Sequence, residues 1–183
     1  MNIYLRTTLS TQSVVQTIAV ALSLETAVAE SVLTEHVIAP NDPSKKAIDV
    51  LIGIDLESTV YTASELDTYR LLHKIATVLT TLKVTAAELV WLFEKGPALG
   101  WLELKRLPLA VPSEAQAANL YAAWKRLIAL YSFRDTYPVA GDATVFSVLD
   151  LVDSGSDRDS VLSTLCSLTG WDLLDVDYLT GVD

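Results

Sequence analysis

Four aspartates crowd one short segment of the chain and form its densest set of possible metal ligands. They are Asp150, Asp153, Asp157 and Asp159, around the sequence Ser154-Gly155-Ser156. Carboxylate oxygens are ligands that calcium prefers, but the segment lacks the alternating ligands and the terminal bidentate glutamate of an EF-hand loop. We therefore expect a solvated loop whose acids cap neighbouring helices, and no metal site.

The other residues that could do chemistry lie apart from one another in the sequence. Cys166 is the single cysteine and stands in an apolar run, which predicts a small core residue rather than a nucleophile. His36 and His73 are the two histidines, and neither has carboxylates or cysteines at metal-ligand spacing, so we expect each to be on the surface or partly buried. The sequence therefore predicts no catalytic residue, no cofactor and no metal, and a protein that is not an enzyme.

Aromatic side chains occur at helical spacing among leucine and isoleucine. The four tryptophans are Trp91, Trp101, Trp124 and Trp171. This setting favours core packing over a ligand cage. Trp124 and Tyr131 share a wide predicted helix face with Leu127, and they are the candidate anchors for a protein or peptide bound in a groove between helix pairs.

Charge and hydropathy exclude some classes of partner. The 183 residues carry a formal net charge of −10 and their lysines and arginines form no cluster, which argues against nucleic acid. The hydrophobic fraction is 51% and the mean hydropathy is +0.36, yet no run reaches the roughly 18 apolar residues of a membrane helix. Such excess apolar surface indicates contact with another chain or with further parts of a longer protein.

A short phrase recurs three times, with an apolar residue, Ser or Thr, two further residues, usually an acid, and then Leu or Val. The copies are Leu22 to Val28, Val84 to Leu89 and Leu168 to Leu173. Thr85 with Glu88 predicts a capping box at a helix start, and Thr169 with Asp172 predicts a shorter-armed version. The repeats predict units of helix, break and helix, which are typical of scaffolds rather than enzymes.

Apolar periodicity predicts helices along nearly the whole chain, with strand alternation almost absent. Breaks are predicted at Ser23, at the turn Asn41 to Ser44, at Lys95 to Gly100 and at Pro138 to Gly141. Capping residues predict further helix starts at Ser64 with Asp67, Ser113 with Gln116, Asp142, and Ser156 with Asp159. The helix after Ser113 is predicted to be the longest and to reach Tyr131 or beyond.

These elements predict an all-α fold, an irregular multi-helix bundle of about nine short to medium helices built of helix-break-helix units. A chain of 183 residues is expected to form a single module over 1–183. A sub-boundary, if there is one, is expected near residues 57–63.

Several segments carry a family resemblance. They are Tyr121 to Asp135, Thr144 to Asp150, Leu162 to Asp172, Leu72 to Leu89 and Leu104 to Leu109. The most specific part is Leu168-Thr169-Gly170-Trp171-Asp172. Together they resemble the α-helical shell region of the A subunit of insecticidal toxin complexes, the Tc toxins, over residues 64–179.

The resemblance implies a secreted virulence protein that assembles as a pentamer, with a helical shell around a channel that delivers an enzyme supplied by other subunits. Because the shell is not catalytic in that family, we expect a structural and interaction module. Its expected partners are other domains or protomers of a larger homo-oligomeric toxin assembly. The family's pH-triggered shell opening would make His73 the candidate pH-sensitive residue, since it interrupts an apolar face and titrates near physiological pH.

Two alternatives stay open at the level of the sequence. The chain is far shorter than such a subunit, so it is expected to be either an excised fragment or a small relative that uses the same module. Met1 to Arg6 lack the features of a signal peptide, so secretion is implied by the resemblance, and the location expected otherwise is cytoplasmic. The alternative function is a free-standing helical adaptor that binds a protein or peptide partner, with Trp124 and Tyr131 as its anchors.

Overall fold

Helices dominate the computed structural model, which describes residues 3–54, 60–139, 141 and 143–181. The chain is 71% helical, which confirms the predicted all-α multi-helix fold. Its internal contacts divide it into two compact units, Met1–Trp124 and Lys125–Asp183, and the division falls within helix α5. The predicted sub-boundary near 57–63 falls inside the first unit, and residues 55–59 lie outside the described part of the chain.

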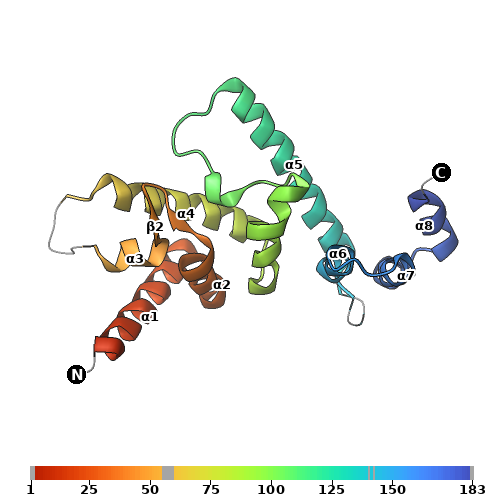
Figure 1. Ribbon diagram of the computed structural model, residues 1–183, viewed down its shortest axis with the longest axis horizontal. Coiled ribbons are helices and arrows are strands. Elements are labelled where there is room, and N and C mark those ends of the chain that lie inside the picture. Colours follow the sequence, from red (N-terminus) through yellow and green to blue (C-terminus); the bar gives the residue numbers. More distant parts are fainter. Residues whose placement is uncertain (1–2, 55–59, 140, 142, 182–183) are drawn as a thin grey trace. The chain divides into compact units, whose positions relative to one another are not determined.

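The first unit contains four α-helices, several short helical turns, a small hairpin and the start of α5 (Figure 1). Its elements are, in order, α1 (Ile3–Leu22), α2 (Thr26–Ser31), η1 (Val32–His36), β1 (Ile38–Ala39), β2 (Asp42–Lys46), α3 (Ala47–Ile52), α4 (Ala63–Thr81), η2 (Ala86–Glu88), η3 (Trp91–Lys95), η4 (Gly96–Leu99), η5 (Leu104–Arg106) and α5 (Glu114–Thr136).

A long helix, a break at a residue with left-handed backbone, and a shorter helical segment follow one another twice in this unit. The break after α1 is at Ser23, with φ 55°, and the break after α4 is at Lys83, with φ 51°. In both, the N–H of the following residue donates to a carbonyl five residues earlier at 2.9 Å, which closes the helix end in a Schellman motif. The chain bends by 116° and 113° at the two breaks. The predicted helix-break-helix unit is therefore present, although neither break residue is a glycine.

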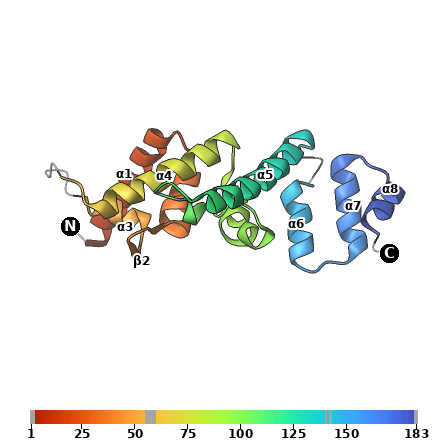
Figure 2. The same cartoon turned by 90° about the horizontal axis from the view of Figure 1, so that it is seen from above.

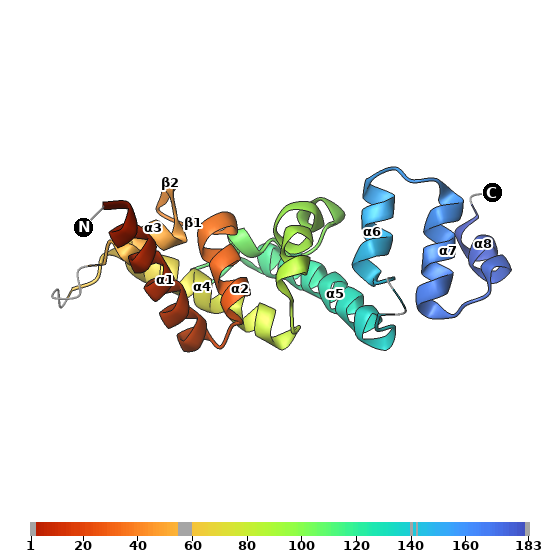
Figure 3. The same ribbon diagram turned by 90° about the horizontal axis from the view of Figure 1, so that it is seen from below.

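Apolar faces of these helices meet in one core. α1 packs against α2, α3 and α4, and α2 packs against η2, as Figure 3 also shows for the helices around α1. α4 buries one apolar face, on which Leu71, Leu72, Ile75 and Leu79 are each at most 2% exposed. Full burial of such a side chain contributes about 1.5–3 kcal/mol to folding.

Some helix starts lie at residues other than those the sequence predicts. The boxes of Thr85 with Glu88 and of Ser113 with Gln116 are confirmed. The start predicted at Ser64 with Asp67 is wrong, because α4 is capped two residues earlier by Thr62. Thr62 has an extended backbone and its hydroxyl accepts from the Glu65 N–H at 3.3 Å, whereas Ser64 already lies in the first helical turn.

The hairpin is an element that the sequence does not predict. β1 and β2 pair antiparallel with an irregular register, and the predicted turn around Asn41 lies between them. Asp42 stabilises the start of β2, since its Oδ1 accepts from the Ser44 N–H at 3.2 Å and from the Ser44 hydroxyl at 2.6 Å. β1 has only two residues, and β2 is polar and contains Pro43, so neither has the alternating pattern that identifies a strand in a sequence.

The second unit contains the end of α5 and three further helices, α6 (Val145–Asp153), α7 (Arg158–Thr169) and α8 (Leu173–Thr180). α6 packs against α7, and α7 against α8, which Figure 2 shows side by side. A small core of Ala143, Val145 and Leu168 is surrounded by half-buried apolar side chains of α5 and α6. α5 reaches Thr136, which confirms the predicted longest helix.

Two predicted caps of this unit are also shifted. Asp157, and not Ser156 with Asp159, caps α7, because its Oδ1 accepts from the Ser160 N–H at 2.9 Å. Asp172 caps α8 by accepting from the Leu174 N–H at 2.8 Å, whereas Thr169 is the last residue of α7. The cap predicted at Asp142 lies outside the described residues.

No single described helix has the length and hydropathy to cross a membrane, in line with the sequence prediction. The two bent helix pairs of the first unit pass that test only when each pair is counted as one, by length and composition alone.

Candidate functional site

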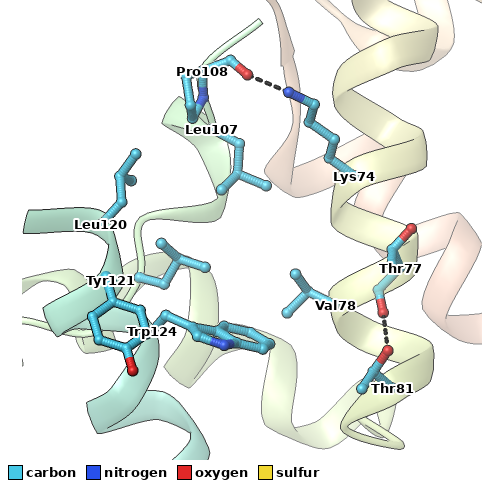
Figure 4. Close-up of a pocket in the computed structure, with 10 residues that line it drawn as sticks. Lys74, Thr77, Val78, Thr81, Leu107, Pro108, Leu120, Tyr121 and Trp124 are labelled. Carbon is cyan, nitrogen blue, oxygen red and sulfur yellow. Dashed lines mark hydrogen bonds between the residues drawn. The ribbon is translucent and has the colours of Figure 1, made fainter. Parts of the chain in front are cut away.

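An open apolar groove of about 520 Å³ lies in the first unit between α4 and the start of α5 (Figure 4). Its lining residues are Lys74, Thr77, Val78 and Thr81 of α4, Leu102, Leu107 and Pro108 of the following segment, and Leu120, Tyr121 and Trp124 of α5. The spacing of three and four residues places each helix's contribution on one face. Val78 and Trp124 point toward each other across the groove in Figure 4.

The polar side chains that α4 contributes to the lining make hydrogen bonds within the protein. The Lys74 Nζ donates to the Pro108 carbonyl and so links α4 to the segment that forms one wall of the groove. The hydroxyls of Thr77 and Thr81 each donate to the carbonyl four residues earlier in α4, at 2.8 and 2.6 Å. The described lining contains no carboxylate, histidine or cysteine. The groove is therefore suited to apolar side chains rather than to an anionic ligand or to acid–base chemistry.

The two predicted anchor residues have different surroundings. Trp124 is half-buried and lines the groove. Tyr131 belongs to the second unit, is 2% exposed, and packs edge-on against Phe146 with ring centroids 6.1 Å apart. The residue of α5 that offers an aromatic ring to solvent at the groove is Tyr121, which is 63% exposed.

Trp124 is thus the predicted anchor that the structure brings to the groove, and Tyr131 is not part of the groove. Tyr121 was not predicted as an anchor. Its position three residues before Trp124 on the same helix is the signal that could have identified it.

The two histidines have different surroundings, and His36 differs from the prediction of a surface or partly buried residue. His73 is exposed on α4 and does not interrupt the buried face of that helix. His36 is 3% exposed, at the end of η1. The sequence contained a signal for this burial, because His36 follows Val28 and Val32 at intervals of four residues and so continues their apolar stripe.

The His36 ring stacks on Phe93 of η3, with ring centroids 4.8 Å apart and planes 4° from parallel. The nearest carboxylates are Glu94, 3.6 Å from Nδ1, and Glu35, 4.0 Å from Nε2. Burial lowers the pKa of His36 below its ordinary value of 6.5, although the Glu94 carboxylate raises it in part. We therefore expect a neutral ring at pH 7.

In the acidic loop between α6 and α7, Asp157 caps the start of α7. Asp157 accepts from both the N–H and the hydroxyl of Ser160, and these bonds lower the pKa of its carboxyl. Within the described residues, no group of three or more His, Cys, Asp and Glu side chains could hold a metal ion. Cys166 is half-buried in α7.

Comparisons with protein-family models, curated proteins and solved structures find no match to this chain, so its groove is interpreted from its own geometry.

Proposed function

We propose that this chain is a non-catalytic helical module that packs against helices of neighbouring modules or protomers in a larger assembly. The observation that carries the proposal is the apolar groove between α4 and α5, with a half-buried Trp124 and an exposed Tyr121 on its lining. Aromatic residues at the edge of a groove are typical of sites where binding energy concentrates.

The kind of assembly follows from the resemblance of residues 64–179 to the Tc toxin shell, which suggests a part of a toxin translocation particle. In such a shell the module acts by packing. The high hydrophobic fraction of 51% and the repeated helix-break-helix units support this proposal, because both suit a scaffold whose apolar surface is shared with other helices.

The occupant that fits the groove best is the apolar face of a helix. Two helices and a wall of Leu107 and Pro108 surround an open surface, and Lys74, Thr77 and Thr81 already have hydrogen-bond partners inside the unit. An amphipathic helix would bury leucine-sized side chains against Val78 and Trp124 without breaking these bonds of α4.

Self-association of the purified chain tests the proposal. We expect the mass measured by light scattering to rise above the 19.9 kDa of one chain as the concentration increases. Tyr121→Glu places a charge at the groove and should weaken this association about tenfold or more, because the charge must be desolvated on contact. Tyr61→Glu is the matched control, since Tyr61 is 54% exposed and does not line the groove. Equal association of both variants would contradict the proposal.

The second candidate is a free-standing helical adaptor that binds a helical peptide of a different protein in the same groove. The groove between two helices suits this candidate as well, because an amphipathic helix of another protein can lay its apolar face into such a groove. The coding sequence around this segment separates the two candidates. A long reading frame with further shell-like helices supports the module, and a short frame supports the adaptor.

A further inference from the structure

The helical segments that follow the two breaks of the first unit meet at an aromatic contact, the stack of His36 on Phe93. His36 ends η1, which follows the break at Ser23, and Phe93 lies in η3, which follows the break at Lys83. Both rings are at most 3% exposed. An ionisable ring therefore sits in the contact between the two repeats.

Within the part of the chain that the structure describes, the His36 ring makes no hydrogen bond. A neutral imidazole carries one N–H donor and one nitrogen acceptor, and burial without partners costs about 1–3 kcal/mol per group. Both ring nitrogens of His36 are buried and unpaired among the described residues. The contact consequently depends on packing of the neutral ring, and no hydrogen bond fixes its protonation state.

Charged side chains face this ring from four elements. Glu35 of η1 and Glu94 of η3 favour the protonated form, whereas Lys46 of β2 and Lys105 of η5 oppose it. Neither carboxylate is within hydrogen-bond distance, and both are more than half exposed. The two carboxylates and the two lysines act on the His36 pKa in opposite directions, and burial is the largest influence. A proton on this ring is therefore unfavourable unless the ring reaches solvent.

We infer that His36 is an acid-sensitive lock, in which the neutral imidazole holds η1 against η3 and protonation opens this contact between the two repeats. In the opened state the imidazolium reaches water and the carboxylates of Glu35 and Glu94. The inference depends on the packing inside the first unit and is independent of the groove and of the function proposed for it.

The direction of the pH effect follows from linkage. Because the pKa of folded His36 is lowered below 6.5, the unfolded or opened chain binds the proton first. The stabilising effect is therefore complete above pH 6.5 and is lost as the pH falls through the folded pKa. Asp42 and Asp157 also have pKa values lowered by hydrogen bonds from serines, but they titrate below about pH 4. The histidine effect thus has its own pH window.

Urea unfolding of the full chain between pH 7.5 and 4.5 tests the lock. For the wild type we expect the folding equilibrium constant to fall by up to tenfold per pH unit once the pH is below 6.5. His36→Phe keeps the aromatic stack without a titrating group and should remove this fall. His73→Gln is the control, because His73 is exposed, and it should keep the wild-type pH profile.

A second measurement keeps the test decisive if His36→Phe does not fold. The imidazole signals of the wild type, followed by NMR, should show His36 titrating below pH 6.5, together with faster amide exchange in η1 and η3 at low pH. A His36 that titrates at or above pH 6.5, or a His36→Phe variant with the wild-type pH profile, would overturn the inference.

Discussion

Gly96 lies where the surrounding atoms leave no room for a side chain. A Cβ atom there would lie 2.3 Å from the Trp101 ring and 2.7 Å from the Trp91 carbonyl oxygen. Gly96→Ala should therefore lower the free energy of unfolding by about 1–3 kcal/mol, as overpacked core sites do. Thermal or urea unfolding of the variant provides the measurement.

Gly53→Ala is the matched control for this substitution. Gly53 has φ −79°, and among the described residues the atom nearest to a Cβ there would be the Asp49 carbonyl oxygen, at 3.3 Å. We expect a change of at most about 0.5 kcal/mol. If the two alanine variants lose similar stability, the close approach of Trp101 to Gly96 is not what requires a glycine.

The sequence identified the aromatic residues of the α5 face, but it did not show which of them stay accessible. Trp124 was predicted as an anchor from helical spacing and does line the groove. Tyr131 follows it on the same helix after seven residues but is buried against Phe146. Periodicity identifies an apolar face of a helix, but which stretch of that face stays open depends on which other elements cover it, and this is set by tertiary packing.

Among the helices, α4 begins at a different capping residue in the structure (Thr62) than in the sequence prediction (Ser64). Thr62→Ala should lower the free energy of unfolding by about 1 kcal/mol, because the Glu65 N–H loses its acceptor. Ser64→Ala, at the residue predicted from the sequence, should change it by a few tenths at most, since Ser64 is already inside the helix. Chemical denaturation of both variants distinguishes the two assignments, and a larger loss in Ser64→Ala would reverse them.

The break between α1 and α2 permits a stabilising substitution. Ser23 has φ 55°, a conformation that disfavours residues with a side chain, and it is exposed. Ser23→Gly should raise the free energy of unfolding by roughly 0.5–1 kcal/mol. The same exchange inside α1, Ser13→Gly, should lower it by roughly 0.5 kcal/mol. If Ser23→Gly is destabilising as well, backbone strain does not control the stability of this break.

The sequence located an element where its signal is local and missed it where the signal is ambiguous or absent. The capping boxes of Thr85 and Ser113 were located because both partners lie within one turn of chain. Extra candidates within two residues, such as Thr62 beside Ser64, made the exact start ambiguous. The hairpin of β1 and β2 was missed because its five-residue strand, Asp42–Lys46, is polar and contains Pro43, so it has no strand pattern.

For the molecule as a whole, the proposed function depends on what contacts the open groove. Charge favours neither nucleic acid nor an anionic ligand, since the chain has a net charge of −10. The internal repeat of two bent helix pairs suits the proposed scaffold, and the groove beside the second pair is the surface through which we propose that it contacts its neighbours.

Photo-crosslinking tests that claim most directly. A benzoylphenylalanine replaces Tyr121 at the groove or, as the control, Tyr61 outside it, and adducts are mapped by mass spectrometry at concentrations where the chain associates. We predict intermolecular adducts from position 121 to apolar side chains of a helix, and few from position 61. Adducts of equal yield from both positions, or an associated state with none from position 121, would contradict the account.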